Sequence, residues 1–427
     1  MTWLQRYRIL NYFRNSIWIL PSLGMLVAMA TVRILNGIEV EMGWIAEFDP
    51  STSMTVMGTL AASMFTLIVF VCSALLISVQ LASASLTPRF ISLVFRNPSI
   101  KLSLTLFVFT FTLTLAALLR IKSTVPMLTA YVACYSCVLS LGVFIYLVDE
   151  VGRALRPSGA LTLVARMGRD VIKNVYPRLL SDLSGAALQP LQIFDKGPRA
   201  TILNPREGVI LAFDIKGLVS LAQTNDCVIE MVPQVGDFVA ADQPLFRIYG
   251  EGEMPASKSL YQSVAVGPER TLQQDPGFAF RIIVDIASKG LSPAINDPTT
   301  AVQAIDQIQY LLRHLGGRRL DEGLRMDAKG SLRLVYQTPD WEDFVGLAVT
   351  EVRHFGGTSI QIARRLRAML ESLIMTLTEK RAAVLQLELS LLTRSARRFF
   401  PDTEDQEMAD VSDLQGVGSK KSFKHKT

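Results

Sequence analysis

The residues best suited to bind a ligand are short polar side chains in and around the segment LSPAINDP, residues 291–298. Hydroxyls and unpaired backbone N–H groups at a helix start favour an anion or a polar ligand. A divalent cation held by carboxylate and amide oxygens is a lesser alternative, and we predict no metal site. A capped corner between two helices, without any ligand, explains the same residue types. The polar residues are Asp285, Ser292, Asn296, Asp297, Thr299 and Thr300.

Two helices must position these side chains. Asp275 and Asp297 are each followed by proline, a pairing typical of an N-cap residue with proline at the first helical position. Gly290 suits the end of the first helix, and Gly316 with Gly317 suits the end of the second. Apolar residues recur every three or four positions along both segments. The spacing therefore predicts helices over 275–290 and 297–317, joined by a stiff connector.

The stretch GPERTLQQDPGFAFRIIVDIASKGLSPAINDPTTAVQAID, residues 267–306, resembles the signature of a bacterial family of integral membrane proteins catalogued as domain of unknown function 2254. The resemblance extends over nearly the whole chain and implies a fold, but no activity. It also implies that Arg270 and Pro298 belong to the family motif. The predicted ligand-binding residues are Arg270, Asp285, Ser292, Asn296, Asp297, Thr299 and Thr300.

Composition indicates a membrane protein with a large soluble part. Half of the 427 residues are apolar and the mean hydropathy is +0.32, with the apolar excess in the first 150 residues. A membrane-spanning helix needs about 20 apolar residues. Four spans are predicted, at 16–32, 54–88, 102–119 and 123–148.

The distribution of charge predicts the orientation of these spans. Arg and Lys concentrate before the first span, between the second and third, and after the fourth, whereas the loop after the first span is acidic. Because positive loops stay inside the cell, we expect a multi-pass protein of the bacterial inner (plasma) membrane with both termini in the cytoplasm.

The second predicted span carries a polar residue at every seventh position, which places them on a nearly constant helical face. Polar side chains in membrane helices seldom face lipid. The stripe therefore packs against another helix or lines a solute path, for instance around the axis of an oligomer. The predicted pore-lining residues are Thr59, Thr66, Ser73, Gln80 and Thr87.

The rest of the chain is expected to be an α+β cytoplasmic region. We predict a four-helix transmembrane domain at 1–150 and a basic amphipathic linker at 151–207, whose helix lies on the inner leaflet or on its own domain. A small β-barrel-like module at 208–255, which resembles a biotinyl/lipoyl hybrid barrel without its carrier lysine, precedes a helical domain at 256–400. Few apolar residues follow, so a disordered tail is predicted at 401–427.

No sequence motif predicts catalysis. The chain has no P-loop, GxGxxG, HExxH or nucleophile elbow, and no basic stripe for nucleic acid. We expect no catalytic residue, no cofactor and no enzyme activity. The favoured function is a homo-oligomeric channel or transporter-like protein regulated by its cytoplasmic domain, with membrane lipids and an unknown small ligand or ion as partners. The alternative is a non-catalytic membrane sensor or scaffold that binds its ligand at the LSPAINDP corner.

Overall fold

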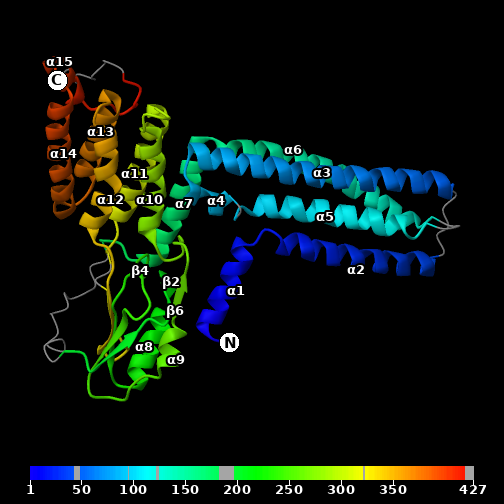
Figure 1. Cartoon of the computed structure of the whole chain (residues 1–427), viewed down its shortest axis with the longest axis horizontal. Helices are drawn as coiled ribbons and strands as arrows, with labels where there is room; N and C mark the ends of the chain where they lie inside the picture. The colour runs from blue at the N-terminus through cyan, green and yellow to red at the C-terminus, as the bar shows by residue number, and fades with distance from the viewer. Residues whose placement is uncertain (43–48, 95, 122–124, 182–196, 321–322, 419–427) are drawn as a thin grey trace. The chain divides into compact units, whose positions relative to one another are not determined.

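The computed structural model describes residues 1–42, 49–94, 96–121, 125–181, 197–320 and 323–418 (Figure 1). The chain divides into two compact units. The membrane unit is Leu10–Gly159, and the soluble unit combines Met1–Ile9 with Ala160–Thr427.

The membrane unit confirms the prediction of four spans. Its candidate spans are Ile19–Met42, Pro50–Ser83, Pro98–Leu118 and Met127–Leu155. The first is longer than predicted, because the helix continues through Arg33 and Glu39 to Met42. The helices are α1 (Trp3–Asn15), which begins in the soluble unit, α2 (Ile19–Met42), α3 (Pro50–Ser85), α4 (Pro88–Val94), α5 (Pro98–Leu118) and α6 (Met127–Leu155).

Local capping fixes where two of the spans begin. The carboxylate of Asp49 accepts a hydrogen bond from the Thr52 amide (3.0 Å) at the start of α3. The side chain of Asn97 does the same for the Ser99 amide (2.9 Å) at the start of α5. In both helices proline takes the first helical position, where a missing N–H is harmless.

Helix α5 lies between α2 on one side and α3 and α6 on the other (Figure 1). Its own apolar residues Leu113 and Ala117 are fully buried against the neighbouring helices. The interior also contains hydroxyls: Thr110 and Ser140 lie 3.0 Å apart and share a hydrogen bond between α5 and α6. Such pairs satisfy polar groups that lipid could not.

The strands of the soluble unit form two open sheets rather than a closed barrel, so the predicted barrel-like module is wrong. One sheet has the order β1-β5-β3-β8-β7 and the other β4-β2-β6. Strand β8 runs parallel to β3, and the other pairs are antiparallel. The strands are β1 (Ala200–Leu203), β2 (Gly208–Phe213), β3 (Val228–Met231), β4 (Phe238–Val239), β5 (Pro244–Tyr249), β6 (Val264–Gly267), β7 (Leu324–Met326) and β8 (Leu332–Tyr336).

The reason for this error is the pairing of strands that lie far apart in the sequence. Strands β7 and β8 follow the two motif helices and complete the five-stranded sheet. Helix α8 (Ile215–Thr224) lies between β2 and β3 in the sequence, and Asp214 caps it through the Gly217 amide (3.0 Å). The core of this region contains Phe246, Ile229 and Leu334.

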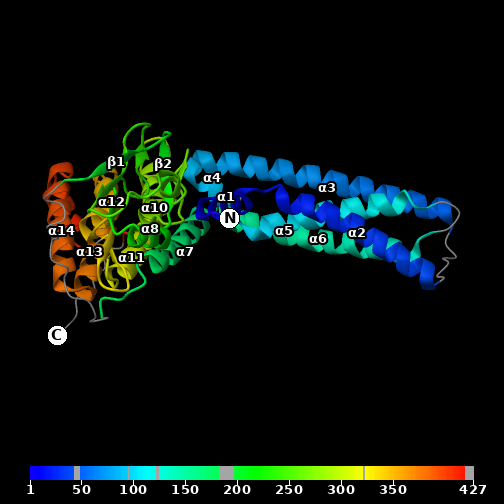
Figure 2. The same ribbon diagram turned by 90° about the horizontal axis from the view of Figure 1, so that it is seen from below.

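The remaining helices of the soluble unit include both predicted motif helices, α10 and α11. In two views α13 and α14 lie side by side (Figures 1 and 2). The helices are α7 (Pro157–Val175), α9 (Ser257–Tyr261), α10 (Pro276–Gly290), α11 (Pro298–Gly316), α12 (Trp341–Phe355), α13 (Ile360–Thr376), α14 (Glu379–Phe399) and α15 (Thr403–Ala409).

Helix α7 is the helix of the predicted basic linker, for which we expected packing on the inner leaflet or on its own domain. Its apolar side chains, among them Leu161, Val164 and Ile172, are buried within the soluble unit. It approaches α10 so closely that a Cβ on Gly168 would lie 2.6 Å from the Cβ of Ala279. The apolar face of α7 therefore packs on its own domain.

Residues 401–418 include α15 and bond to α13, which differs from the disorder predicted for this part of the tail. The guanidinium of Arg364 donates to the Val411 carbonyl (3.0 Å), and Arg367 forms an ion pair with Asp410. Long-range pairing with α13 thus fixes a segment whose own composition is polar. Residues 419–427 lie outside the described part of the chain.

Candidate functional site

The LSPAINDP corner is an exposed turn whose polar groups bond to one another. Asp297 caps α11, accepting from the Thr300 amide (3.1 Å) and from the Thr300 hydroxyl (2.5 Å). The hydroxyl of Ser292 donates to the Lys289 carbonyl (2.7 Å), and exposed Asn296 adopts a left-handed φ of 48°. These contacts match the capped-corner interpretation made from the sequence.

Asp285 lies away from the corner, near the middle of α10. It accepts a hydrogen bond from Arg281 Nε (2.7 Å), and Arg281 Nη1 also donates to Glu351 of α12 (2.7 Å). The carboxylates of Asp285 and Asp297 are therefore engaged in separate places. Among the described residues no group of three His, Cys, Asp or Glu side chains could hold a metal ion.

Arg270 lies at the opposite end of α10 from the corner. Its guanidinium forms a two-pronged ion pair with Asp275, whose second oxygen is 3.1 Å from Nη2. Asp275 is 4% exposed and caps α10 through the Phe278 amide (3.0 Å). Because α10 has 15 residues, about 20 Å of helix separates Arg270 from the corner.

Burial makes Asp275 electrostatically unusual. It raises the pKa of the Asp275 carboxyl above its ordinary value of 3.8, because desolvation penalises the charged form. The nearby Arg270 guanidinium opposes the change. The Asp275 carboxylate therefore has a structural role, because both of its oxygens accept hydrogen bonds.

A cleft of about 410 Å³, the α10 cleft, opens beside Asp275. Five segments distant in the sequence build it: the end of α7, the β2–α8 junction, the loop between β3 and β4, the residues before α10, and the stretch from β7 to α12. The residues that line it are Asn174, Val175, Tyr176, Pro177, Phe213, Ile215, Val235, Gln273, Gln274, Asp275, Pro276, Arg325, Tyr336, Gln337, Thr338 and Pro339.

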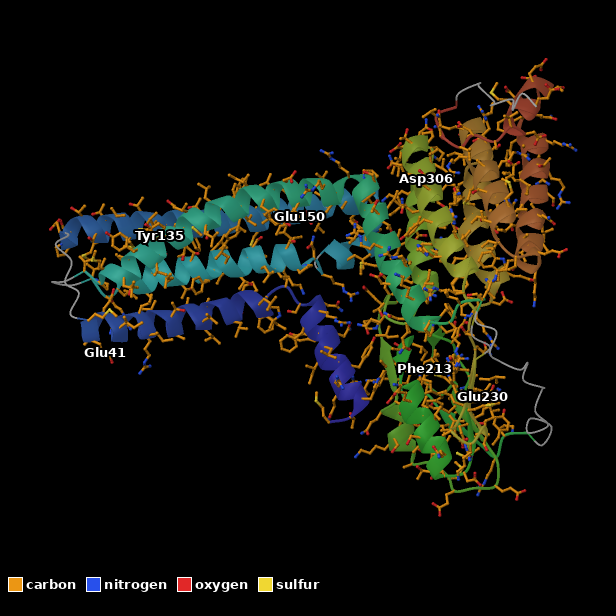
Figure 3. All side chains as sticks on the ribbon, turned by 180° about the vertical axis from the view of Figure 1, so that it is seen from behind. Glu41, Tyr135, Glu150, Phe213, Glu230 and Asp306 are labelled. Atoms are coloured by element: carbon orange, nitrogen blue, oxygen red, sulfur yellow. The ribbon has the colours of Figure 1, made fainter. Side chains whose placement is uncertain are left out.

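Aromatic rings and a fixed amide shape the wall of the α10 cleft. The rings of Phe213 and Tyr336 lie 5.0 Å apart at 67°, and the Arg325 guanidinium sits 5.2 Å over the Tyr336 ring. The side chain of Gln274 bonds both backbone groups of Phe213, accepting at 3.1 Å and donating at 3.2 Å. Phe213 lies among the strands (Figure 3).

The polar rim of the cleft comes from loops. The hydroxyls of Tyr176 and Thr338 lie 3.1 Å apart, and Asn174 and Gln337 are exposed. Flat aromatic surface beside neutral amides and hydroxyls suits a small, polar, planar ligand. No periodic pattern in the sequence predicts this site. The one local clue was the run Gln273-Gln274-Asp275 before a predicted helix.

In the membrane unit the predicted polar stripe faces outwards. Thr59, Thr66, Ser73 and Gln80 are exposed; Met64 and Leu75, on the opposite side of α3, are buried. These four residues are the α3 stripe. Thr87 is not part of it, because α3 ends at Ser85, and Thr87 is buried.

Two of the hydroxyls in the α3 stripe bond within their own helix, whereas in the described part of the chain the amide does not. Thr59 donates to the Thr55 carbonyl (2.8 Å) and Thr66 to the Ala62 carbonyl (3.0 Å). Within the described residues the Gln80 side chain has no such partner. A primary amide facing lipid is costly, so Gln80 favours a covering partner or water at this face.

Sequence reasoning missed two buried charged groups at the ends of the bundle. The ammonium of Lys101 donates to the Arg14 carbonyl (2.6 Å) at the end of α1, and Glu39 accepts from the Thr129 amide (2.9 Å) in the first turn of α6. Both satisfy backbone groups at helix termini. In the sequence each is a single charge near the end of an apolar run, and such a charge looks the same as an exposed residue that flanks a membrane span.

Comparison with known proteins places this architecture among uncharacterised membrane proteins. A family described as "Predicted membrane protein (DUF2254)" matches residues 14–372. An uncharacterized protein of Mycobacterium bovis and one of Mycobacterium tuberculosis are each 25% identical over 424 residues, covering 95% of this chain and 80% of theirs. No solved structure matches the chain.

Proposed function

We propose that this chain, which belongs to the DUF2254 family of predicted membrane proteins, is a membrane-anchored receptor whose soluble unit binds a small polar ligand in the α10 cleft. The α10 cleft is the observation that carries the proposal. Its volume of about 410 Å³ lies in the range of small-molecule sites, which are concave and combine apolar walls with a few polar groups.

The chemistry of the lining favours binding over catalysis. The lining residues contain one carboxylate, Asp275, and Arg270 and the Phe278 amide already occupy it. The other polar groups are amides, hydroxyls and the Arg325 guanidinium. A nucleophile with an adjacent base, which acyl or phosphoryl transfer would need, is not part of this lining.

Two matched variants test the receptor proposal. Gln337→Trp places a large ring at the cleft rim, whereas Gln223→Trp makes the same change at an exposed position of α8 outside the lining. The full-length protein in detergent is screened by thermal unfolding against nucleosides, nucleotides and amino acids. A ligand present at 100 times its Kd stabilises by about 2.7 kcal/mol.

We expect at least one compound to raise the Tm of the wild type and of Gln223→Trp, but not that of Gln337→Trp. The receptor proposal fails if no compound in the panel stabilises the wild type. It also fails if Gln337→Trp responds as strongly as the control.

The α3 stripe supports a second candidate function, an oligomeric channel or transporter-like protein. Polar residues on an outward-facing side of a membrane helix need a partner, and copies meeting at the stripe would enclose a path lined by hydroxyls and the Gln80 amide. In liposomes Gln80→Leu should change solute flux several-fold, whereas Ile77→Leu should not. Absence of any flux through the wild type would contradict this function.

We further propose the inner membrane as the location, with both termini in the cytoplasm, on the strength of the basic segments that flank the spans. Single cysteines introduced at Arg166 and Val40 test the orientation. A membrane-impermeant maleimide added to intact cells should label the residue-40 variant only. Labelling of the residue-166 variant instead would reverse the orientation.

A further inference from the structure

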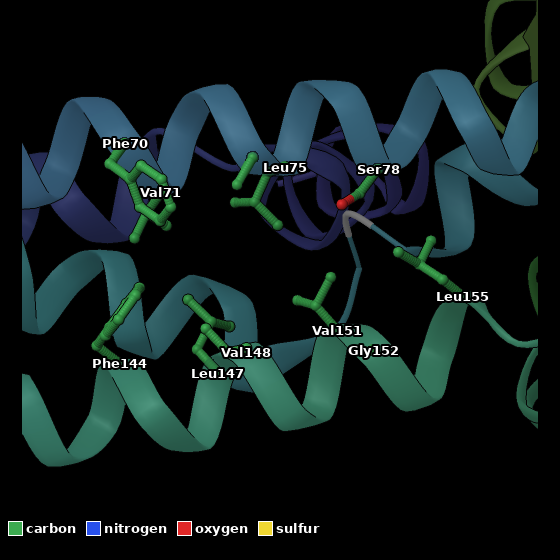
Figure 4. Close-up of a pocket in the computed structure, with 11 residues that line it drawn as sticks. Phe70, Val71, Leu75, Ser78, Phe144, Leu147, Val148, Val151, Gly152 and Leu155 are labelled. Atoms are coloured by element: carbon green, nitrogen blue, oxygen red, sulfur yellow. The ribbon is translucent and has the colours of Figure 1, made fainter.

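A narrow apolar groove runs between α3 and α6 in the membrane unit (Figure 4). We call it the α3–α6 groove. It has a volume of about 220 Å³, and Ser78 is the single residue with a polar side chain in its lining. Along α6 it extends from Phe144 to Leu155, which is about 17 Å at 1.5 Å per residue. One leaflet of a hydrocarbon core is about 15 Å thick.

The two ends of the groove differ. Near one end the rings of Phe70 and Phe144 meet edge to face, 6.1 Å apart. Near the other, Gly152 has no side chain, and a Cβ there would find no atom within 4 Å. The groove is thus bounded by aromatic rings at its apolar end and is open beside Gly152.

Charged residues appear on α6 where the groove opens. Arg153 forms ion pairs with Asp149 (2.9 Å) and Glu150 (3.1 Å). Arg156 follows the last residue of α6 and is exposed, and α7 begins directly after it at Pro157. The end of an apolar run marked by such charges is where a spanning helix leaves hydrocarbon for the headgroup region.

We propose that the α3–α6 groove binds one acyl chain of an anionic phospholipid, whose phosphate lies at Arg156. The length of the groove matches one leaflet, its lining matches a hydrocarbon chain, and the cation at its open end complements a phosphate.

Two glycines of α6 provide a matched pair for the test. Gly152 lines the groove and Gly142 does not, and a Cβ at either would meet nothing within 4 Å. Gly152→Phe therefore fills the groove, while Gly142→Phe adds the same ring elsewhere on the helix. The full-length proteins, in mild detergent, receive phosphatidylglycerol or phosphatidylcholine, and native mass spectrometry counts the lipids retained.

We expect the wild type and Gly142→Phe to retain one phosphatidylglycerol and Gly152→Phe to retain it at least tenfold less. Arg156→Gln should reduce the preference for phosphatidylglycerol over phosphatidylcholine about threefold. Helix content by circular dichroism checks the fold, and Ala74→Phe, on the α3 wall, replaces Gly152→Phe if that variant aggregates.

Three results would overturn the proposal. Equal phosphatidylglycerol retention by Gly152→Phe and Gly142→Phe would remove the groove as the site. Equal retention of both lipids by the wild type would remove the anionic headgroup. Conversion of a wild-type dimer to a monomer by Gly152→Phe, with lipid unchanged, would identify the groove as a contact between copies.

Discussion

An Asp-Pro pair lies at each end of α10, but the two pairs have different structural roles. Each begins a helix with an Asp-Pro pair: Asp275 starts α10 and Asp297 starts α11. At the corner, Asp297 is partly exposed and bonds its own turn, whereas Asp275 is buried, paired with Arg270 and beside a cleft. The same Asp-Pro pair thus occurs in an exposed turn and in a buried ion pair, and the tertiary contacts of each aspartate determine which of the two forms.

The largest expected effect comes from removing the buried ion pair. Asp275→Ala leaves the Arg270 guanidinium without its carboxylate and α10 without its cap. Breaking a buried pair costs about 3–5 kcal/mol, and because Arg270 is 38% exposed we expect about 2–3 kcal/mol. Chemical unfolding of the full-length protein in detergent measures the loss.

A conservative control separates the two roles of Asp275. Asp275→Asn keeps an oxygen for the Phe278 amide and loses the charge that pairs with Arg270. It should recover part of the stability lost in Asp275→Ala. If Asp275→Ala costs no more than an ordinary cap, the contrast between the two ends of α10 is wrong.

A smaller loss is expected at the corner. Asp297→Ala removes the acceptor of the Thr300 amide and hydroxyl, which should cost about 1 kcal/mol, the typical value of an N-cap. Asp297→Ser, which keeps a capping oxygen, should stay within a few tenths of the wild type. A drop in Tm as large as that of Asp275→Ala would contradict the surface-turn assignment.

The exposed Asn296 should matter still less. Its φ of 48° suits glycine and asparagine, so Asn296→Gly should be neutral, and Asn296→Ala should cost about 0.5–1 kcal/mol through backbone strain. Neither change should alter the Tm increase given by a cleft ligand. If Asn296→Gly abolished that Tm increase, the ligand would bind at the LSPAINDP corner and not in the α10 cleft.

The smallest effect is a pH dependence carried by Asp275. Its pKa is raised in the folded protein, so the folded state binds the proton more tightly than the unfolded state. The Asp275 contribution to stability therefore falls as pH rises from 3.8 through the raised pKa, and recovers on acidification. Because Arg270 opposes the shift, the slope should be shallow.

Comparison with Asp275→Asn isolates this dependence. The unfolding free energy of the wild type minus that of the variant, measured at several pH values, should decrease as pH rises. An increase with pH would mean that the ion pair with Arg270 outweighs burial.

The sequence predicted the features that depend on neighbouring residues. Apolar runs identified the four spans, and Asp-Pro pairs identified the starts of α10 and α11. Hydroxyl spacing identified the α3 stripe except for Thr87, where the helix had already ended. These features need no knowledge of the rest of the chain.

The features that were missed depend on contacts between distant segments. Nothing near Val228–Met231 indicates that β3 pairs with β8, some hundred residues later. The order of residues 401–418 depends on Arg364 and Arg367 of α13. The α10 cleft needs five segments in place before it exists, so no single stretch predicts it.

The parallel pairing of β3 with β8 also has a consequence for biosynthesis. While a ribosome is making residues 250–331, β3 has β5 to pair with but still lacks β8, and an unpaired strand edge invites association with other chains. The spans emerge first and can insert early. The soluble unit, by contrast, must wait for residue 336 before its larger sheet is complete, and a chain released before that point would be a substrate for chaperones or proteases.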